Sequence, residues 1–112
     1  FRKHKNKFGH NQLAYFDHVF SNEEKEIEVL KVEFYETIRS SWEKLLADGE
    51  VSDTQLKKVS QSSRKLVQSC RESNAKLYPF AGLEAAKTET ELNRVWRDFN
   101  TVSQHSLLTF PF

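Results

Sequence analysis

The residues that could carry out chemistry are few and scattered along the chain. The four histidines are His4, His10, His18 and His105, and no two of them lie three or four residues apart, as two ligands on one helical face must. The Glu-x-x-His motif that helical di-iron sites need is also missing. One cysteine, Cys70, can form neither an internal disulfide nor a thiolate zinc site. The sequence therefore predicts no metal site and no cofactor.

Nucleophilic catalysis lacks a recognisable set of residues as well. Cys70 falls on the inner seam of a predicted helix, where a thiol is typically inert. Three glycines in 112 residues make no Gly-x-Ser-x-Gly motif and no phosphate-binding loop. The neighbouring carboxylates of Glu23 and Glu24 are explained by capping of a helix start. We therefore expect a domain without enzymatic activity.

Positive charge gathers at the N-terminus, although the net charge of the chain is only +1. Residues 1–10 hold four basic residues and no acid, whereas the rest holds 13 bases and 16 acids. A flexible arm over 1–10 is predicted to bind an anionic membrane surface through its four cations. These are Arg2, Lys3, Lys5 and Lys7. Nucleic acid is a less favoured partner, because domains that bind nucleic acid carry a larger excess of positive charge than +1. The alternative interpretation of residues 1–10 is a solvated linker without a binding role.

Composition predicts a folded domain inside the cell. Hydrophobic residues make up 38% of the chain, and 9 Phe, 3 Tyr and 2 Trp are too many for a disordered tail. No apolar run approaches the roughly 20 residues that cross a bilayer, and no secretory signal follows the basic start. An unpaired cysteine favours the cytoplasm, and the basic arm favours a position near a membrane. Because methionine is absent, we expect a fragment of a larger protein.

Hydrophobic spacing predicts an all-α fold built on a long antiparallel hairpin of two helices, about 22–48 and 53–77. The apolar residues of the first recur every 3.6 positions on average, and Gly49 is placed to end it. They are Ile27, Leu30, Phe34, Ile38, Trp42 and Leu45. The second begins at a Ser52/Gln55 capping box and ends before Pro79. Its predicted seam is Leu56, Val59, Ser63, Leu66, Cys70, Ser73 and Leu77.

Two shorter helices are predicted to cover this hairpin and complete a four-helix bundle over residues 11–105. The first spans about 11–20 and stops at the capping box that starts at Ser21. The last begins at the capping box Thr88–Glu91 and runs to about residue 104. The short turn between the two long helices places position i of the first opposite about 100 − i of the second. An apolar, extended tail follows over 106–112.

Four aromatic residues lie off the main apolar stripes or in a predicted loop: Tyr35, Tyr78, Phe80 and Trp96. Exposed Trp and Tyr are enriched in binding hot spots, so these residues are predicted to bind a partner, with a place in the core as the alternative. The functional prediction is a non-enzymatic intracellular domain that binds another protein as an adaptor, scaffold or regulator. The alternative is a module that binds an anionic membrane surface, and a second copy of the chain is a further candidate partner.

Overall fold

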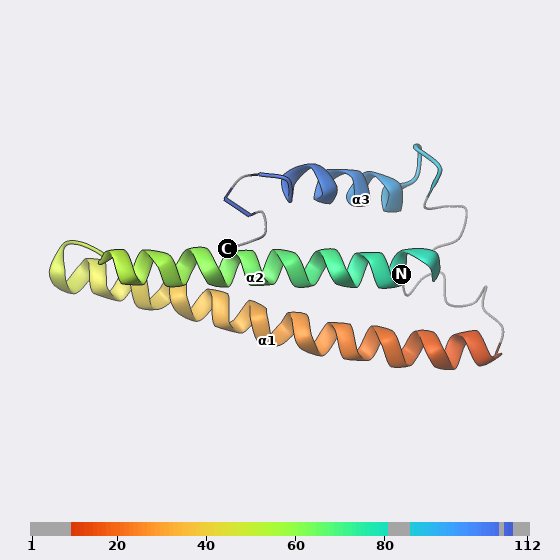
Figure 1. Ribbon diagram of the computed structural model, residues 1–112, viewed down its shortest axis with the longest axis horizontal. Coiled ribbons are helices and arrows are strands. Elements are labelled where there is room, and N and C mark those ends of the chain that lie inside the picture. The colour runs from red at the N-terminus through yellow and green to blue at the C-terminus, as the bar shows by residue number, and fades with distance from the viewer. Residues whose placement is uncertain (1–9, 81–85, 106, 109–112) are drawn as a thin grey trace.

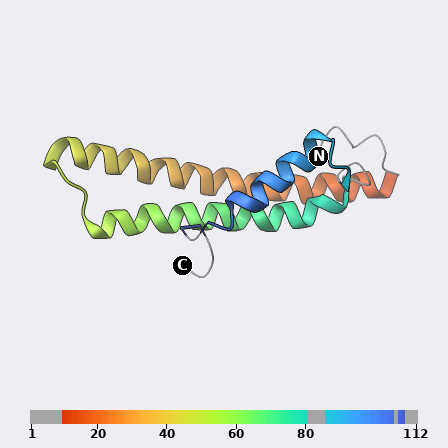
Figure 2. The same cartoon turned by 90° about the horizontal axis from the view of Figure 1, so that it is seen from above.

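The described part of the chain folds into three α-helices (Figure 1). The structure is a computed structural model that describes residues 10–80, 86–105, 107 and 108. Helix α1 spans His10–Asp48, α2 spans Asp53–Leu77 and α3 spans Glu91–Val102. Helices α1 and α2 form an antiparallel hairpin, and α3 crosses that hairpin obliquely at the end away from its turn (Figure 2). The predicted all-helical class and the long hairpin are confirmed, whereas the described residues form no four-helix bundle.

The predicted break at Ser21 is wrong, because α1 continues through it without interruption. No glycine or proline occurs between His10 and Asp48, so nothing in the backbone forces the helix to stop. A capping box contributes only about 1 kcal/mol, and it competes with contacts that a continuous helix makes to α2. Glu23, two residues after the expected cap, is buried against α2 instead. The separate N-terminal helix is therefore the first third of α1.

Small and polar side chains fill the seam between α1 and α2. Apart from Leu77 at its end, the buried residues of α2 are Gln55, Ser62, Ser69 and Ser73. The hydroxyls of Thr37 and Ser62 lie 3.0 Å apart across the seam, and the Gln55 amide donates to the Ser41 hydroxyl at 2.9 Å. The first contact places position i of α1 opposite 99 − i of α2 and the second places it opposite 96 − i, so the observed register lies one to four residues from the predicted 100 − i.

The face that each helix turns to its neighbour agrees with the predicted one at Ser73 and Leu77, which are buried, and differs from it toward the turn. On α2 the buried positions 55, 62 and 69 each precede a predicted seam residue by one. On α1, Ile38, Trp42 and Leu45 were expected inside but are 42%, 58% and 38% exposed. The apolar residues of α1 recur with a period of 3.6 residues, whereas the contact between two helices packed side by side recurs every 3.5 residues. Over the 18 residues from 27 to 45 the two patterns drift apart by roughly 50°.

The apolar core is small and lies at the end of the hairpin away from the turn. Phe16 is 1% exposed and Leu77 is 6% exposed, and they are the only buried hydrophobic side chains among the described residues. The ring of Phe16 lies 5.1 Å from that of Phe80 and 5.5 Å from that of Phe20. The chain measures 57 × 27 × 23 Å and its radius of gyration is 17.5 Å, against about 13 Å for a compact domain of this length.

Most helix ends lie where the sequence predicts them, because a few neighbouring residues determine them. Gly49 adopts φ of 78° after α1, and the Ser52 hydroxyl accepts a hydrogen bond from the Gln55 backbone N–H. Helix α3 is capped by Thr90, whose hydroxyl accepts from the Asn93 N–H, so the predicted cap at Thr88 is wrong by two residues. None of the described helices has the length and hydropathy needed to span a membrane.

Two predicted segments fall largely outside the described part of the chain. Residues 1–9 are not described, so the arm with Arg2, Lys3, Lys5 and Lys7 stays a prediction. Of the tail over 106–112, only Leu107 and Leu108 are described.

The seam offers a matched pair of serines that tests how its polarity affects stability. The buried Ser69 hydroxyl has no hydrogen-bond partner among the described residues, whereas Ser62 contacts Thr37. We expect Ser69→Ala to raise the free energy of unfolding by about 0.5–1 kcal/mol, because it removes an unsatisfied buried group and improves helix propensity. Ser62→Ala should lower it by about 1 kcal/mol. Urea unfolding followed by circular dichroism measures both, and equal losses would contradict this account of the seam.

Candidate functional site

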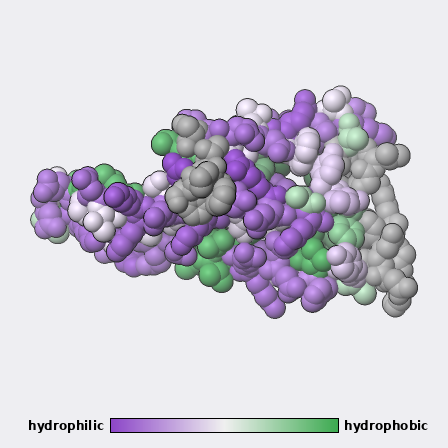
Figure 3. Space-filling view, viewed as in Figure 1, coloured by the Kyte–Doolittle hydropathy of each residue, from purple (hydrophilic) through white to green (hydrophobic). Residues whose placement is uncertain are grey.

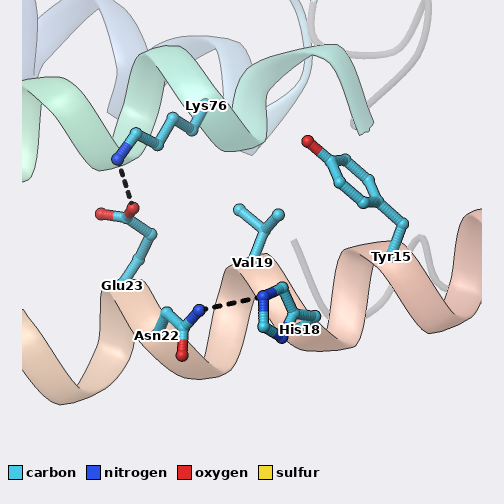
Figure 4. Close-up of a pocket in the computed structure, with 6 residues that line it drawn as sticks. All are labelled: Tyr15, His18, Val19, Asn22, Glu23 and Lys76. Carbon is cyan, nitrogen blue, oxygen red and sulfur yellow. Dashed lines mark hydrogen bonds and ion pairs between the residues drawn. The ribbon is translucent and has the colours of Figure 1, made fainter.

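A polar pocket of about 470 Å³ lies beside the core, between the first third of α1 and the end of α2 (Figure 4). Helical spacing on α1 brings five of its lining residues to one side, and α2 supplies the sixth. The lining residues are Tyr15, His18, Val19, Asn22, Glu23 and Lys76. Glu23 and Lys76 point toward each other across the pocket, and Asn22 contacts the His18 ring at 3.3 Å.

Glu23 is the most buried charged residue that the structure describes, with 6% of its surface exposed. One carboxylate oxygen accepts a hydrogen bond from the Lys76 ammonium at 2.7 Å. The other accepts from the Ser73 hydroxyl at 2.6 Å. The hydrogen bond from Lys76, followed by that from Ser73, holds the pKa of Glu23 below its ordinary value. The same bond raises the pKa of Lys76, so both groups stay charged at neutral pH.

This charge state decides what the pocket can do chemically. A general base works best when its pKa lies near the working pH, and the lowered pKa of Glu23 moves it in the opposite direction. Lys76, whose pKa is raised, is equally unsuited to give up or accept a proton at neutral pH. The pair therefore ties α1 to α2 and fixes their register, while the exposed His18 and Asn22 leave the rim of the pocket polar.

A second pocket, of about 300 Å³, lies between α2 and α3. Its wall is mostly aromatic and amide side chains: Arg71, Asn74, Ala75, Tyr78, Pro79, Trp96, Phe99, Asn100 and Gln104. The rings of Tyr78 and Trp96 stack with their centroids 4.9 Å apart and their planes inclined by 27°. Arg71 donates to the backbone carbonyl of Ser103, just beyond the end of α3. These two contacts hold α3 on the hairpin.

The four aromatic residues predicted to bind a partner do not form one surface. Tyr78 and Trp96 stack on each other in the second pocket. Phe80 lies against the core, 5.1 Å from the ring of Phe16. Tyr35 is 59% exposed on the middle of α1, away from the other three. Their role in binding a partner stays a prediction, and Tyr35 is the one with the most free surface.

The contact between Glu23 and Lys76 was missed because Glu23 was assigned to a helix cap. The predicted register already placed position 23 opposite the end of the second helix, where Lys76 lies. An acid and a base opposite each other in an antiparallel hairpin are the signal that could have found the pair.

Among the described residues, no cluster of His, Cys, Asp and Glu could hold a metal ion. Burial raises the pKa of the Cys70 thiol, which disfavours the reactive thiolate.

Removing the charge of Glu23 tests its role in stability. We expect Glu23→Gln to lower the free energy of unfolding at neutral pH by about 1–2 kcal/mol, because Lys76 and Ser73 lose a charged acceptor. The pKa of Glu23 is lower in the folded state than the ~4.3 of an unfolded chain. The charged carboxylate therefore makes its full contribution to the free energy of unfolding at pH values above the pKa of the unfolded chain. It is lost as the pH falls through the folded-state pKa.

The difference between wild type and Glu23→Gln should therefore shrink in acid. Chemical unfolding at several pH values between neutral and strongly acidic measures it. Glu33→Gln, which changes an exposed glutamate of the same helix, is the control and should unfold like the wild type at every pH. A constant difference down to strongly acidic pH would contradict the assignment.

Comparison with known proteins connects the chain to a domain of an enzyme family. The family model described as acyl-CoA dehydrogenase, C-terminal domain, matches residues 10–110, which is most of the chain. This match overturns the prediction of a non-enzymatic adaptor, scaffold or regulatory domain. Searches of curated proteins and of solved structures give no match. The chain belongs to the family of the acyl-CoA dehydrogenase C-terminal domain.

Proposed function

We propose that the chain is the helical C-terminal domain of an enzyme that oxidises acyl-CoA thioesters. The observation that carries this proposal is the family match across residues 10–110. Two features of the fold support it. The chain buries few apolar side chains on its own, and the described residues hold no set of groups that could complete the reaction alone. A domain that works as part of a larger enzyme needs neither.

Dehydrogenation of an acyl group removes two hydrogens from neighbouring carbon atoms, so the enzyme needs a base and an electron acceptor. Glu23 is the only buried carboxylate among the described residues, and its lowered pKa and its bond to Lys76 make it a poor base. The base is therefore expected outside the described part of this chain.

An electron acceptor such as a flavin dinucleotide fits neither pocket by itself. The pyrophosphate of a dinucleotide needs cationic or backbone N–H partners. The cation of the first pocket, Lys76, is bound to Glu23, and that of the second, Arg71, is bound to the carbonyl of Ser103. The aromatic faces of Tyr78 and Trp96 are likewise stacked on each other. The described residues therefore do not fit a flavin dinucleotide by themselves.

We further propose that the domain is part of a four-helix bundle in the assembled protein. Support comes from the hairpin itself, because α3 covers only one of its ends and apolar side chains remain exposed at the other. In such an enzyme the hairpin supplies a long rigid support. Helix α3, which is attached through Tyr78 and Trp96, forms a wall whose position affects the active site of the assembled enzyme. The proposed contribution of the chain is therefore shape and positioning.

The protein that carries this chain, produced from its complete coding sequence, should reduce an electron-accepting dye when given acyl-CoA thioesters. Trp96→Ala should lower kcat/KM by about tenfold or more, since α3 loses its stacking contact and shifts on the hairpin. Val95→Ala changes the exposed neighbour on the same helix and should leave the rate unchanged. Failure to oxidise thioesters of short, medium and long chain length would overturn the proposed function.

A further inference from the structure

The pocket between α2 and α3 has a cationic end and an aromatic end. Arg71 of α2 donates to the carbonyl of Ser103, and Tyr78 of α2 stacks on Trp96 of α3. Both contacts place position i of α2 opposite 174 − i, so α3 runs antiparallel to α2. Arg71 and Tyr78 are seven residues apart, and both line the pocket. The two ends of the pocket are therefore separated by about 10 Å along α2.

Hydrogen-bond donors gather at the cationic end of this pocket. Asn74 lies three residues after Arg71 on the same side of α2, and Gln104 directly follows the residue whose carbonyl Arg71 binds. None of the described residues forms a hydrogen bond with the side-chain amide of Asn74 or of Gln104. Two amides and a guanidinium thus face the same part of the pocket.

The positive charge of Arg71 is only partly balanced. The wall of the pocket contains no acidic residue, and no described carboxylate forms an ion pair with Arg71. The C-terminal end of α3 balances about half a charge, because the dipole of a helix is equivalent to roughly −0.5 there. The guanidinium also donates to the side chain of Gln68, at 3.5 Å, and keeps further N–H groups for a ligand. This end of the pocket therefore favours a ligand with one negative charge.

The opposite end of the pocket suits an apolar group. Pro79 and Phe99 complete the wall beside the stacked rings of Tyr78 and Trp96. On the face shown in Figure 3 the surface is mostly hydrophilic, and hydrophobic residues form separate spots. An apolar ligand finds no broad apolar surface on that face, whereas the pocket offers about 300 Å³ beside aromatic side chains. This volume lies at the lower end of the range for small-molecule sites.

We propose that this pocket binds a small monocarboxylate whose apolar body has about eight carbon atoms, a length that matches the separation of its two ends. The carboxylate accepts hydrogen bonds from Arg71, Asn74 and Gln104, because a guanidinium presents N–H groups in a geometry that fits a carboxylate. The apolar body lies against the aromatic end. A dinucleotide has two phosphate groups and needs more cations, whereas a monocarboxylate needs only one.

A ligand in this position contacts both helices, so its binding strengthens the attachment of α3 to the hairpin. A ligand that binds only the folded state raises the melting temperature in proportion to the logarithm of its concentration, once that concentration exceeds the dissociation constant. The proposal does not rest on acyl-CoA oxidation, because the ligand is a free acid and the measurement is of binding.

Isothermal titration calorimetry of the 112-residue chain with octanoate tests the proposal. The wild type should bind one octanoate with a dissociation constant of about 0.1–1 mM. Octan-1-ol has the same body without the charge, and acetate has the charge without the body. Each should bind about tenfold more weakly or worse, since each contacts one end of the pocket only. Equal affinity for octan-1-ol and octanoate would overturn the proposal, as would a wild type that binds no octanoate.

Substitutions in the chain locate the site. Arg71→Gln should weaken octanoate binding about tenfold or more, because the carboxylate loses its cation. Arg94→Gln makes the same change at an exposed arginine of α3 outside the pocket, and it should bind octanoate like the wild type. Arg71→Gln also removes the contact with Ser103, so Ala75→Phe gives an independent test. It fills the pocket while Arg71 is retained, and it should abolish binding.

Circular dichroism checks that the three variants keep the helical content of the wild type. Equal effects of Arg71→Gln and Arg94→Gln would contradict the role of Arg71. Octanoate binding that is unchanged in Ala75→Phe would overturn the location of the site. Binding that appears only after residues 106–112 are removed would assign the pocket to the tail of the chain instead.

Discussion

The polar seam between α1 and α2 is the constraint on which the other features of the structure depend. Its α2 side is made of Gln55 and three serines, so the two helices are held by hydrogen bonds and by the Glu23–Lys76 pair more than by apolar packing. Hydrogen bonds between specific partners fix a register strongly, but they contribute little net stability each. The hairpin is therefore well aligned and poor in buried apolar surface.

The apolar residues of α1 are consequently divided between two places. Near its start, Phe16 enters the small core with Phe80, and this end of the hairpin also receives α3. Toward the turn, the seam passes through Thr37 and Ser41, so the larger side chains turn away from α2. An isolated domain would have little reason to expose them, whereas a domain inside a larger enzyme or an oligomer can bury them against its neighbours.

Membership in an enzyme family also explains why a search for catalytic residues was misleading. The prediction of a protein without enzymatic activity assumed that the reacting groups lie within the chain. This prediction was wrong, because a domain can belong to an enzyme and supply support rather than reacting groups. Spacing and charge within 112 residues carry no information on that point.

The sequence by itself determined the features that depend on a few neighbouring residues: the helical class, the turn at Gly49, the cap at Ser52 and the register to within about four residues. Tertiary structure decided the rest. Contacts of Glu23 with α2 outweigh the local cap that predicted a break at Ser21, since a cap contributes only about 1 kcal/mol. The difference between periods of 3.6 and 3.5 turned Ile38 and Trp42 outward, because only the packed pair of helices sets which period the seam follows.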